Sequence, residues 1–157
     1  MAKEIERKYL VVDQKYRYVA SEAIDIEQGY LNRDPMRTIR VRTRGSSGFI
    51  TVKGPNSGIS RDEWEFPIDV RDAREMLDRL CDGSVLTKTR YIVPFGENVW
   101  EVDEFHGDLE GLVVAEVELP DETSIISELP DFIGREVSDD TRYYNSSLAG
   151  GVIPPFE

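Results

Sequence analysis

Charged residues two positions apart recur along this chain, beginning with E-I-E-R-K at residues 4–8. In an extended strand, side chains at i and i+2 lie on the same face. One such pair is typical of a solvated strand face, but the same spacing in seven separate segments favours one shared charged surface. Its candidate members are the carboxylates Glu4, Glu6, Glu63, Glu65, Glu101, Asp103, Glu116 and Glu118 and the cations Lys8, Arg40, Arg42, Lys53, Lys88 and Arg90.

Both signs of charge on one surface indicate a particular kind of ligand. Clustered cations suit phosphate oxygens, and arginine offers them two parallel donors. Clustered carboxylates suit a hard divalent ion such as Mg²⁺ or Mn²⁺. A ligand that uses both is a polyphosphate with a bound metal. Eight carboxylates and six cations leave the surface near −2, so most of the net charge of −12 lies elsewhere.

The charged pairs fall in seven of eight segments that read as strands, which are joined mostly by short turns and are therefore mostly antiparallel. Apolar residues such as Ile5, Val41 and Val117 alternate with the charges and can pack on the opposite face. One solution is a mainly β fold with helices (α+β), in which an eight-stranded antiparallel barrel has a charged lumen and helices outside. Such a barrel can hold one small ligand. The expected strands are 3–11, 26–32, 37–44, 49–53, 59–68, 85–95, 99–105 and 112–119.

Three helices are expected between or after these strands. Asp69 can cap a helix that runs to about residue 82, with an apolar stripe at helical spacing. A short helix is expected near 122–129, and a last one from about Ser138 or Asp139 to Gly150. The segment G-P-N-S-G at 54–58 predicts a turn. No linker or repeat divides the chain, so residues 1–157 are expected to form a single domain.

Composition narrows the class of protein and its surroundings. A net charge of −12 and a pI near 4.6 disfavour nucleic acid and anionic membranes as partners. No apolar run approaches the roughly 20 residues that span a bilayer. The N-terminus has no apolar signal stretch, and Cys81 is the single cysteine, so a cytoplasmic protein is expected. The single histidine, His106, argues against an imidazole-rich zinc site.

The charged motifs, taken in order, resemble those of the triphosphate tunnel metalloenzymes, also called CYTH-domain proteins, over almost the whole chain. The resemblance implies an eight-stranded tunnel and a divalent metal, Mg²⁺ or Mn²⁺, used to hydrolyse or cyclise a triphosphate. Within the family, the chain is most similar to the short bacterial inorganic triphosphatases. The matching motifs are E-I-E-R-K at 4–8, R-V-R at 40–42, T-V-K at 51–53, E-W-E at 63–65, K-T-R-Y at 88–91, E-V-D at 101–103, E-V-E at 116–118 and D-D-T-R-Y-Y-N at 139–145.

The same resemblance implies roles for individual residues. Glu4, Glu6, Glu116 and Glu118 are the leading metal ligands, and Glu63, Glu65, Glu101 and Asp103 are further ligands or residues that orient them. Tyr30, in the Q-G-Y-L stretch at 28–31, forms a candidate proton-transfer pair with Lys8. The cations that bind the triphosphate are Lys8, Arg40, Arg42, Lys53, Lys88, Arg90 and, from the last helix, Arg142.

Metal-dependent hydrolysis of inorganic triphosphate to diphosphate and phosphate is therefore the leading hypothesis. An adenylyl cyclase of the same fold is disfavoured, because only three residues precede Glu4 and the His-Phe pair typical of that branch is missing. A thiamine triphosphatase would need an aromatic stacking group. Trp64 alternates with Glu63 and Glu65, so its side chain is expected on the outer face of the barrel, packed in the core between the strands and the helices. A non-catalytic module that binds polyphosphate or nucleotide is the third alternative. The expected partner is a small-molecule triphosphate, and the resemblance leaves a homodimer open.

Overall fold

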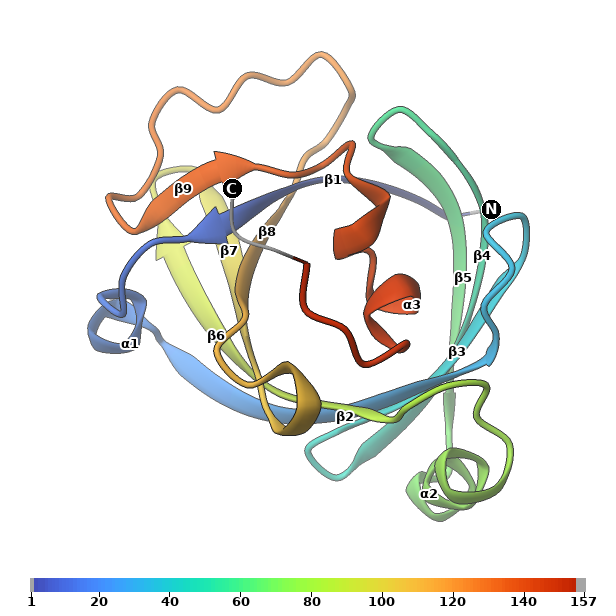
Figure 1. Ribbon diagram of the computed structural model, residues 1–157. Helices are drawn as coiled ribbons and strands as arrows, with labels where there is room; N and C mark the ends of the chain where they lie inside the picture. The colour runs from blue at the N-terminus through green and yellow to red at the C-terminus, as the bar shows by residue number, and fades with distance from the viewer. Residues whose placement is uncertain (1, 155–157) are drawn as a thin grey trace.

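Eight antiparallel strands close into a barrel, which confirms the predicted fold class (Figure 1). The computed structural model describes residues 2–154, apart from the side chain of Ala2, so part of the predicted domain 1–157 lies outside the described residues. The strand order is β5-β4-β3-β2-β6-β7-β8-β1, and pairing of β1 with β5 closes the ring. The strands are β1 (Ala2–Val11), β2 (Glu22–Asn32), β3 (Thr38–Arg44), β4 (Ser47–Ser57), β5 (Ser60–Ile68), β6 (Leu86–Phe95), β7 (Asn98–Phe105) and β8 (Val113–Glu118).

Two apolar clusters cover parts of the outer wall of the barrel. Trp100, Val102 and Val117 are buried beneath the short helix α1 (Tyr16–Val19) and a ninth strand, β9 (Ile133–Glu136), that pairs with β1. On the other side, α2 (Val70–Arg79) packs on β3 and β4. A Cβ on Gly48 would lie 3.0 Å from the Cβ of Ala73, which shows how closely α2 approaches the sheet. These coverings turn the alternate, charged face of the strands toward the lumen.

The helix predicted after Asp69 is confirmed, with small differences at its end. The Asp69 carboxylate accepts a hydrogen bond of 2.8 Å from the backbone N–H of Arg71, which caps α2 at its first turn. By contrast, the helix predicted near 122–129 is wrong. There the Asp121 carboxylate accepts hydrogen bonds from Thr123 and Ser124, which holds a turn instead.

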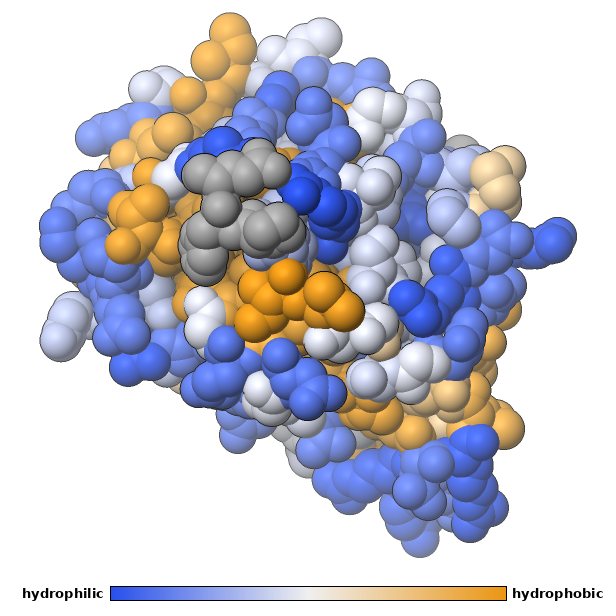
Figure 2. All heavy atoms as spheres, viewed as in Figure 1, coloured by the Kyte–Doolittle hydropathy of each residue, from blue (hydrophilic) through white to orange (hydrophobic). Residues whose placement is uncertain are grey.

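The C-terminal segment differs most from the expected outer helix. It is divided into the 3₁₀ turn η2 (Thr141–Tyr143) and α3 (Asn145–Leu148), because Tyr144 has extended backbone angles. Figure 1 places α3 over the centre of the barrel, and Figure 2, in the same view, shows side chains filling this end. Leu148 and Tyr143 are buried there with Tyr30, Leu86 and Phe105. The tunnel is therefore covered at one end by its own C-terminal segment.

Trp64 faces outward as predicted, but the expectation that it packs in the core is wrong. Its side chain is 37% exposed, and Phe66 on the same face is 55% exposed. The reason is that α2 packs against β2, β3 and β4 and leaves this part of β5 uncovered. In the described residues, no helix is long and apolar enough to cross a bilayer.

Candidate active site

The lumen contains a charged cavity of about 310 Å³, which we call the wide cavity. All of its lining residues except Asn145 are charged, and they come from β1 and from β3 through β8. A smaller cavity of about 60 Å³, the narrow cavity, continues from it toward the C-terminal segment. The two cavities share Glu4, Glu6, Lys53 and Asn145. Residues that lie far apart in the sequence therefore meet along one continuous space.

Arg90 is the most completely bonded cation in the lumen. Its Nε and Nη2 donate to the two oxygens of Asp103 at 2.8 and 2.9 Å, and its Nη1 donates to Glu101 at 3.0 Å. Lys88 Nζ lies 2.7 Å from the same Asp103, and burial lowers the pKa of Lys88 to about 8. Both Asp103 oxygens are thus engaged by cations. This geometry makes Asp103 a residue that orients Arg90 and Lys88.

A second group forms on the opposite wall, where β3, β4 and β5 are neighbours. Arg40 and Arg42 donate to one oxygen of Glu65, at 3.2 and 3.4 Å, and the Thr51 hydroxyl donates to it at 2.8 Å. Burial, together with the charges of Arg40 and Arg90, lowers the pKa of Arg42 to about 10. Two guanidinium groups crowded around one carboxylate leave an excess of positive charge. This wall is suited to phosphate oxygens.

Carboxylates crowd together where β1 meets β5 and β8. Lys53 Nζ lies 2.9 Å from Glu4 and 3.6 Å from Glu63. Burial raises the pKa of Glu6 well above its usual range, and the charges of Glu116 and Glu4 raise it further. Burial and a hydrogen bond with Glu4 raise the pKa of Glu63 to about 7. The cluster therefore contains more carboxyl groups than its lysines can pair with, and the raised pKa values show that ionising all of them together is unfavourable without a further cation.

That excess fits a divalent cation. Among the described residues, no group of three or more aspartate, glutamate, histidine or cysteine side chains is already arranged to hold a metal ion. The carboxylates are instead paired with lysine and arginine, and a bound phosphate chain would compete for those cations. Oxygen donors of this kind are the ligands that Mg²⁺ and Mn²⁺ prefer. The donors in reach are Glu4, Glu6, Glu63, Glu116 and, at the exposed end of β8, Glu118.

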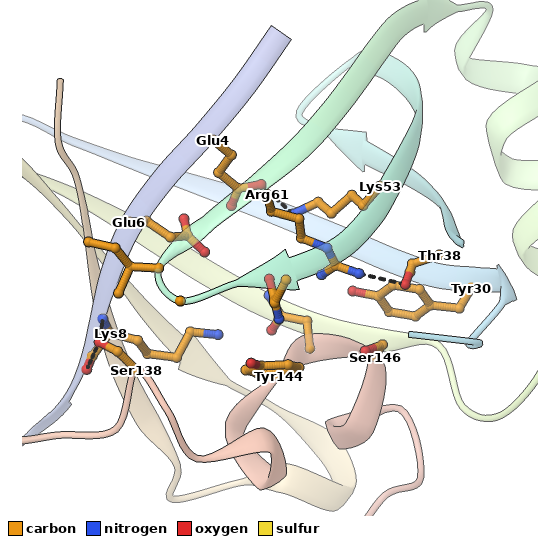
Figure 3. Close-up of a pocket in the computed structure, with 14 residues that line it drawn as sticks. Glu4, Glu6, Lys8, Tyr30, Thr38, Lys53, Arg61, Ser138, Tyr144 and Ser146 are labelled. Atoms are coloured by element: carbon orange, nitrogen blue, oxygen red, sulfur yellow. Dashed lines mark hydrogen bonds and ion pairs between the residues drawn. The ribbon is translucent and has the colours of Figure 1, made fainter. Parts of the chain in front are cut away.

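Lys8 lines the narrow cavity. Its Nζ donates to the carbonyl of Tyr143 at 3.0 Å and lies 3.4 Å from Glu116. Burial acts to lower the pKa of Lys8, but the charges of Glu116 and Glu6 outweigh it and raise the pKa. Tyr30 also lines the narrow cavity (Figure 3), and its hydroxyl accepts a hydrogen bond of 3.4 Å from Gln28. The structure thus brings Lys8 and Tyr30 to one cavity.

Comparison with known proteins agrees with this arrangement. A model of the CYTH domain matches residues 2–147. The chain belongs to the CYTH family. It is 47% identical, over 94% of each chain, to an inorganic triphosphatase of Acetivibrio thermocellus. It is also 38% identical to an inorganic triphosphatase of Nitrosomonas europaea, over 93% of this chain and 96% of that one.

Solved structures of CYTH proteins have the same fold. The crystal structure of the inorganic triphosphatase NE1496 superimposes with a TM-score of 0.66 at 35% identity, and the match covers 99% of both chains. Membership of this family of triphosphate tunnel metalloenzymes implies a divalent metal.

Most site residues predicted for this CYTH protein line one of the two cavities, whereas Glu65, Lys88, Asp103 and Arg142 line neither. Glu65 and Asp103 pair with arginines that line the wide cavity, and Lys88 pairs with Asp103. Arg142 donates to Asp140 at 2.6 Å and 43% of its side chain is exposed, so its role in substrate binding stays a prediction. Sequence reasoning missed Arg61, which lines the narrow cavity, and Gln28, which is fully buried. The signal for Arg61 was the spacing R-D-E-W-E, which puts it on the same face as Glu63 and Glu65.

Proposed function

We propose that this CYTH protein hydrolyses inorganic triphosphate to diphosphate and phosphate, with Mg²⁺ or Mn²⁺ as cofactor. The observation that carries the proposal is that six motif cations, each paired with a carboxylate, and the carboxylate cluster gather around the lumen of one barrel. A triphosphate carries several negative charges near neutral pH, and this lumen supplies cations along its length. The relatives named inorganic triphosphatase, which match nearly end to end, support the same substrate.

The chain's own residues bind and orient the substrate. Arg40, Arg42 and Arg90 can each donate more than one hydrogen bond to phosphate oxygens, and their carboxylate partners fix their directions. Lys8 and Lys53 add positive charge near the acidic cluster, where negative charge develops on the leaving oxygen. The carboxylates of β1, β5 and β8 would hold the divalent ion, which would supply neutralisation of the phosphate charge and orientation of a water for in-line attack.

The substrate preference follows from what lines the wide cavity. No aromatic side chain lines it within residues 2–154, and Trp64 faces the outside. A nucleobase or a thiamine ring therefore has nothing to stack on there, whereas a chain of phosphates finds donors on both walls. We also propose the cytoplasm as the compartment, because a single cysteine provides no internal disulfide. A homodimer stays a prediction that light scattering can test.

One panel of assays tests the proposed function. Inorganic triphosphate, ATP and thiamine triphosphate are each incubated with Mg²⁺ and with Mn²⁺, and free phosphate and cyclic nucleotide are measured. We expect the highest kcat/KM for inorganic triphosphate, with no cyclic product from ATP. A cyclic product would instead indicate a cyclase. Tight triphosphate binding with no phosphate release under either metal would indicate a binding module.

The proton-transfer role proposed for Tyr30 has its own test. Tyr30→Phe removes the hydroxyl but keeps a ring of almost the same shape in a buried position. If the hydroxyl takes part in proton transfer, kcat should fall by about 100-fold or more while KM changes little. The measurement is steady-state phosphate release from inorganic triphosphate. A loss of less than about tenfold, below the usual range for proton transfer, would leave Tyr30 as part of the cavity wall only.

A further inference from the structure

A shift of register between β4 and β5 lies beside Arg61. Lys53 pairs with Glu63, but the register then shifts, and the next pair is Asn56 with Arg61. Gly54 and Pro55 lie in this bulge, where proline has no backbone N–H to donate to the ladder. The predicted turn at 54–58 is therefore a bulge followed by a tighter turn at Gly58, since β4 continues to Ser57.

The bulge fixes the guanidinium of Arg61 at two points. Its Nε donates to the carbonyl of Gly54 at 2.6 Å, and its Nη2 donates to the hydroxyl of Thr38 at 2.8 Å. Thr38 is 1% exposed, and its own hydroxyl donates to the carbonyl of Asp34 at 3.1 Å. Arg61 thus extends from β5 beneath β4 to β3 (Figure 3) and is held in one orientation.

Neither anchor of Arg61 carries a charge. Each of the six motif cations in the lumen has a carboxylate within 4.0 Å, whereas Arg61 has no such ion pair in the part of the chain that the structure describes. A guanidinium has five N–H donors, and the two hydrogen bonds leave three of them. Arg61 lines the narrow cavity, so a half-buried positive charge with unused donors borders a space that Lys8 and Lys53 also line.

The narrow cavity is suited to one end of a phosphate chain. Its volume of about 60 Å³ accommodates a few water-sized groups and not a nucleoside. Besides its charged residues it is lined by the neutral donors Tyr30, Ser138, Tyr144 and Ser146. We propose that Arg61 is a seventh substrate-binding cation, which holds the terminal phosphoryl group of inorganic triphosphate in the narrow cavity. This inference rests on the proposed function and adds Arg61 to the six cations of the lumen, as the family resemblance implied for Arg142.

The test measures binding without turnover. The probe is bis(methylene)triphosphonate, in which P–C–P links replace the P–O–P links that hydrolysis breaks, titrated with Mg²⁺ by calorimetry. Hydrogen bonds to charged groups contribute about 1.5–3 kcal/mol, so Arg61→Ala should weaken binding by about 10- to 100-fold. Arg61→Lys should recover part of the loss because it keeps the charge. Arg74→Ala, which removes an exposed arginine of α2, is the matched control and should leave the dissociation constant unchanged.

A purely structural role for Arg61 predicts a different result. If Arg61 only holds the bulge, Arg61→Ala should lower the melting temperature equally with and without the probe. If Arg61 contacts the ligand, the rise in melting temperature caused by the probe should itself shrink. If Arg61→Ala binds the probe within twofold of the wild-type affinity, the assignment is wrong. If the alanine variant cannot be purified, the affinity of Arg61→Gln for the probe is measured instead and is interpreted in the same way. If the wild type binds the probe but releases no phosphate from inorganic triphosphate, the proposed function is wrong. The dissociation constants of the variants would still show whether Arg61 binds the phosphate chain.

Discussion

Arg90→Met is expected to abolish phosphate release and to lower the free energy of unfolding by about 3–5 kcal/mol, the usual cost of removing one partner of a buried ion pair. Arg90 is 5% exposed and donates to both oxygens of Asp103, which is 2% exposed. Without Arg90, the buried carboxylate keeps only Lys88 as a charged partner. The variant therefore loses a phosphate donor and leaves a buried charge poorly compensated.

Denaturant unfolding and phosphate release measure the two effects separately. The double variant Arg90→Met with Asp103→Asn should regain neither the activity nor the stability, because Asp103→Asn also takes the carboxylate away from the buried Lys88. Arg7→Met serves as the control, since Arg7 and Glu136 form an exposed pair and such pairs contribute about 0–1 kcal/mol. If Arg90→Met lowers the free energy of unfolding no more than Arg7→Met does, the buried pair of Arg90 and Asp103 does not stabilise the barrel as expected.

Glu116→Gln combined with Glu118→Gln should raise the metal concentration needed for half-maximal activity by at least about tenfold, as even changes around a metal ligand do. Glu116 is buried, and although burial acts to raise its pKa, the charges of Lys8, Arg90 and Lys88 outweigh burial and hold the pKa well below its usual range. It is thus a charged oxygen donor at neutral pH. Glu118 lies two residues further along the same face of β8, at the end of the wide cavity.

The measurement is phosphate release titrated with Mg²⁺ and with Mn²⁺. A control with the same change of net charge is Glu110→Gln with Glu122→Gln, because both residues are exposed and neither lines the lumen cavities. That control should keep the wild-type metal dependence. An unaltered metal requirement in the Glu116 and Glu118 variant would remove both residues from the metal site, while leaving triphosphate hydrolysis itself untouched.

The strand register of this protein could be predicted from its sequence because alternation has only two phases. Once Ile5 is assigned to the outer face, Glu4, Glu6 and Lys8 must face inward, and the same reasoning places Arg40, Arg42 and Glu116. What alternation does not show is which charges pair. Asp103 and Glu116 look alike in the sequence, yet one is held by Arg90 and Lys88 and the other lies beside Lys8.

The failures occur where local patterns are weak or are overridden by packing. Ile125, Ile126 and Leu129 have helical spacing, but the Asp121 carboxylate accepts the backbone N–H of Thr123 in a turn. Ile126 instead packs against the cluster around Trp100 from a segment without regular secondary structure. Arg142 lies in a matching motif, but the expected helix is divided at Tyr144, and in the short turn η2 Arg142 pairs with Asp140 and lines neither cavity. Arg61 was missed because its role depends on a bulge that the glycine and proline of β4 suggested only as a turn.

The position of β1 has a consequence for how the chain reaches its native state. The first strand pairs with β8, so that Lys8 lies opposite Glu116, and with β9 near the C-terminus. Most other neighbouring strands are successive in the chain and can pair early. During synthesis, β1 must wait for β8 to leave the ribosome before the ring can close. Contacts of such long sequence separation slow folding. Until they form, the charged face of β1, with Glu4, Glu6 and Lys8, remains in water, and charged side chains on an unpaired strand discourage association with other chains.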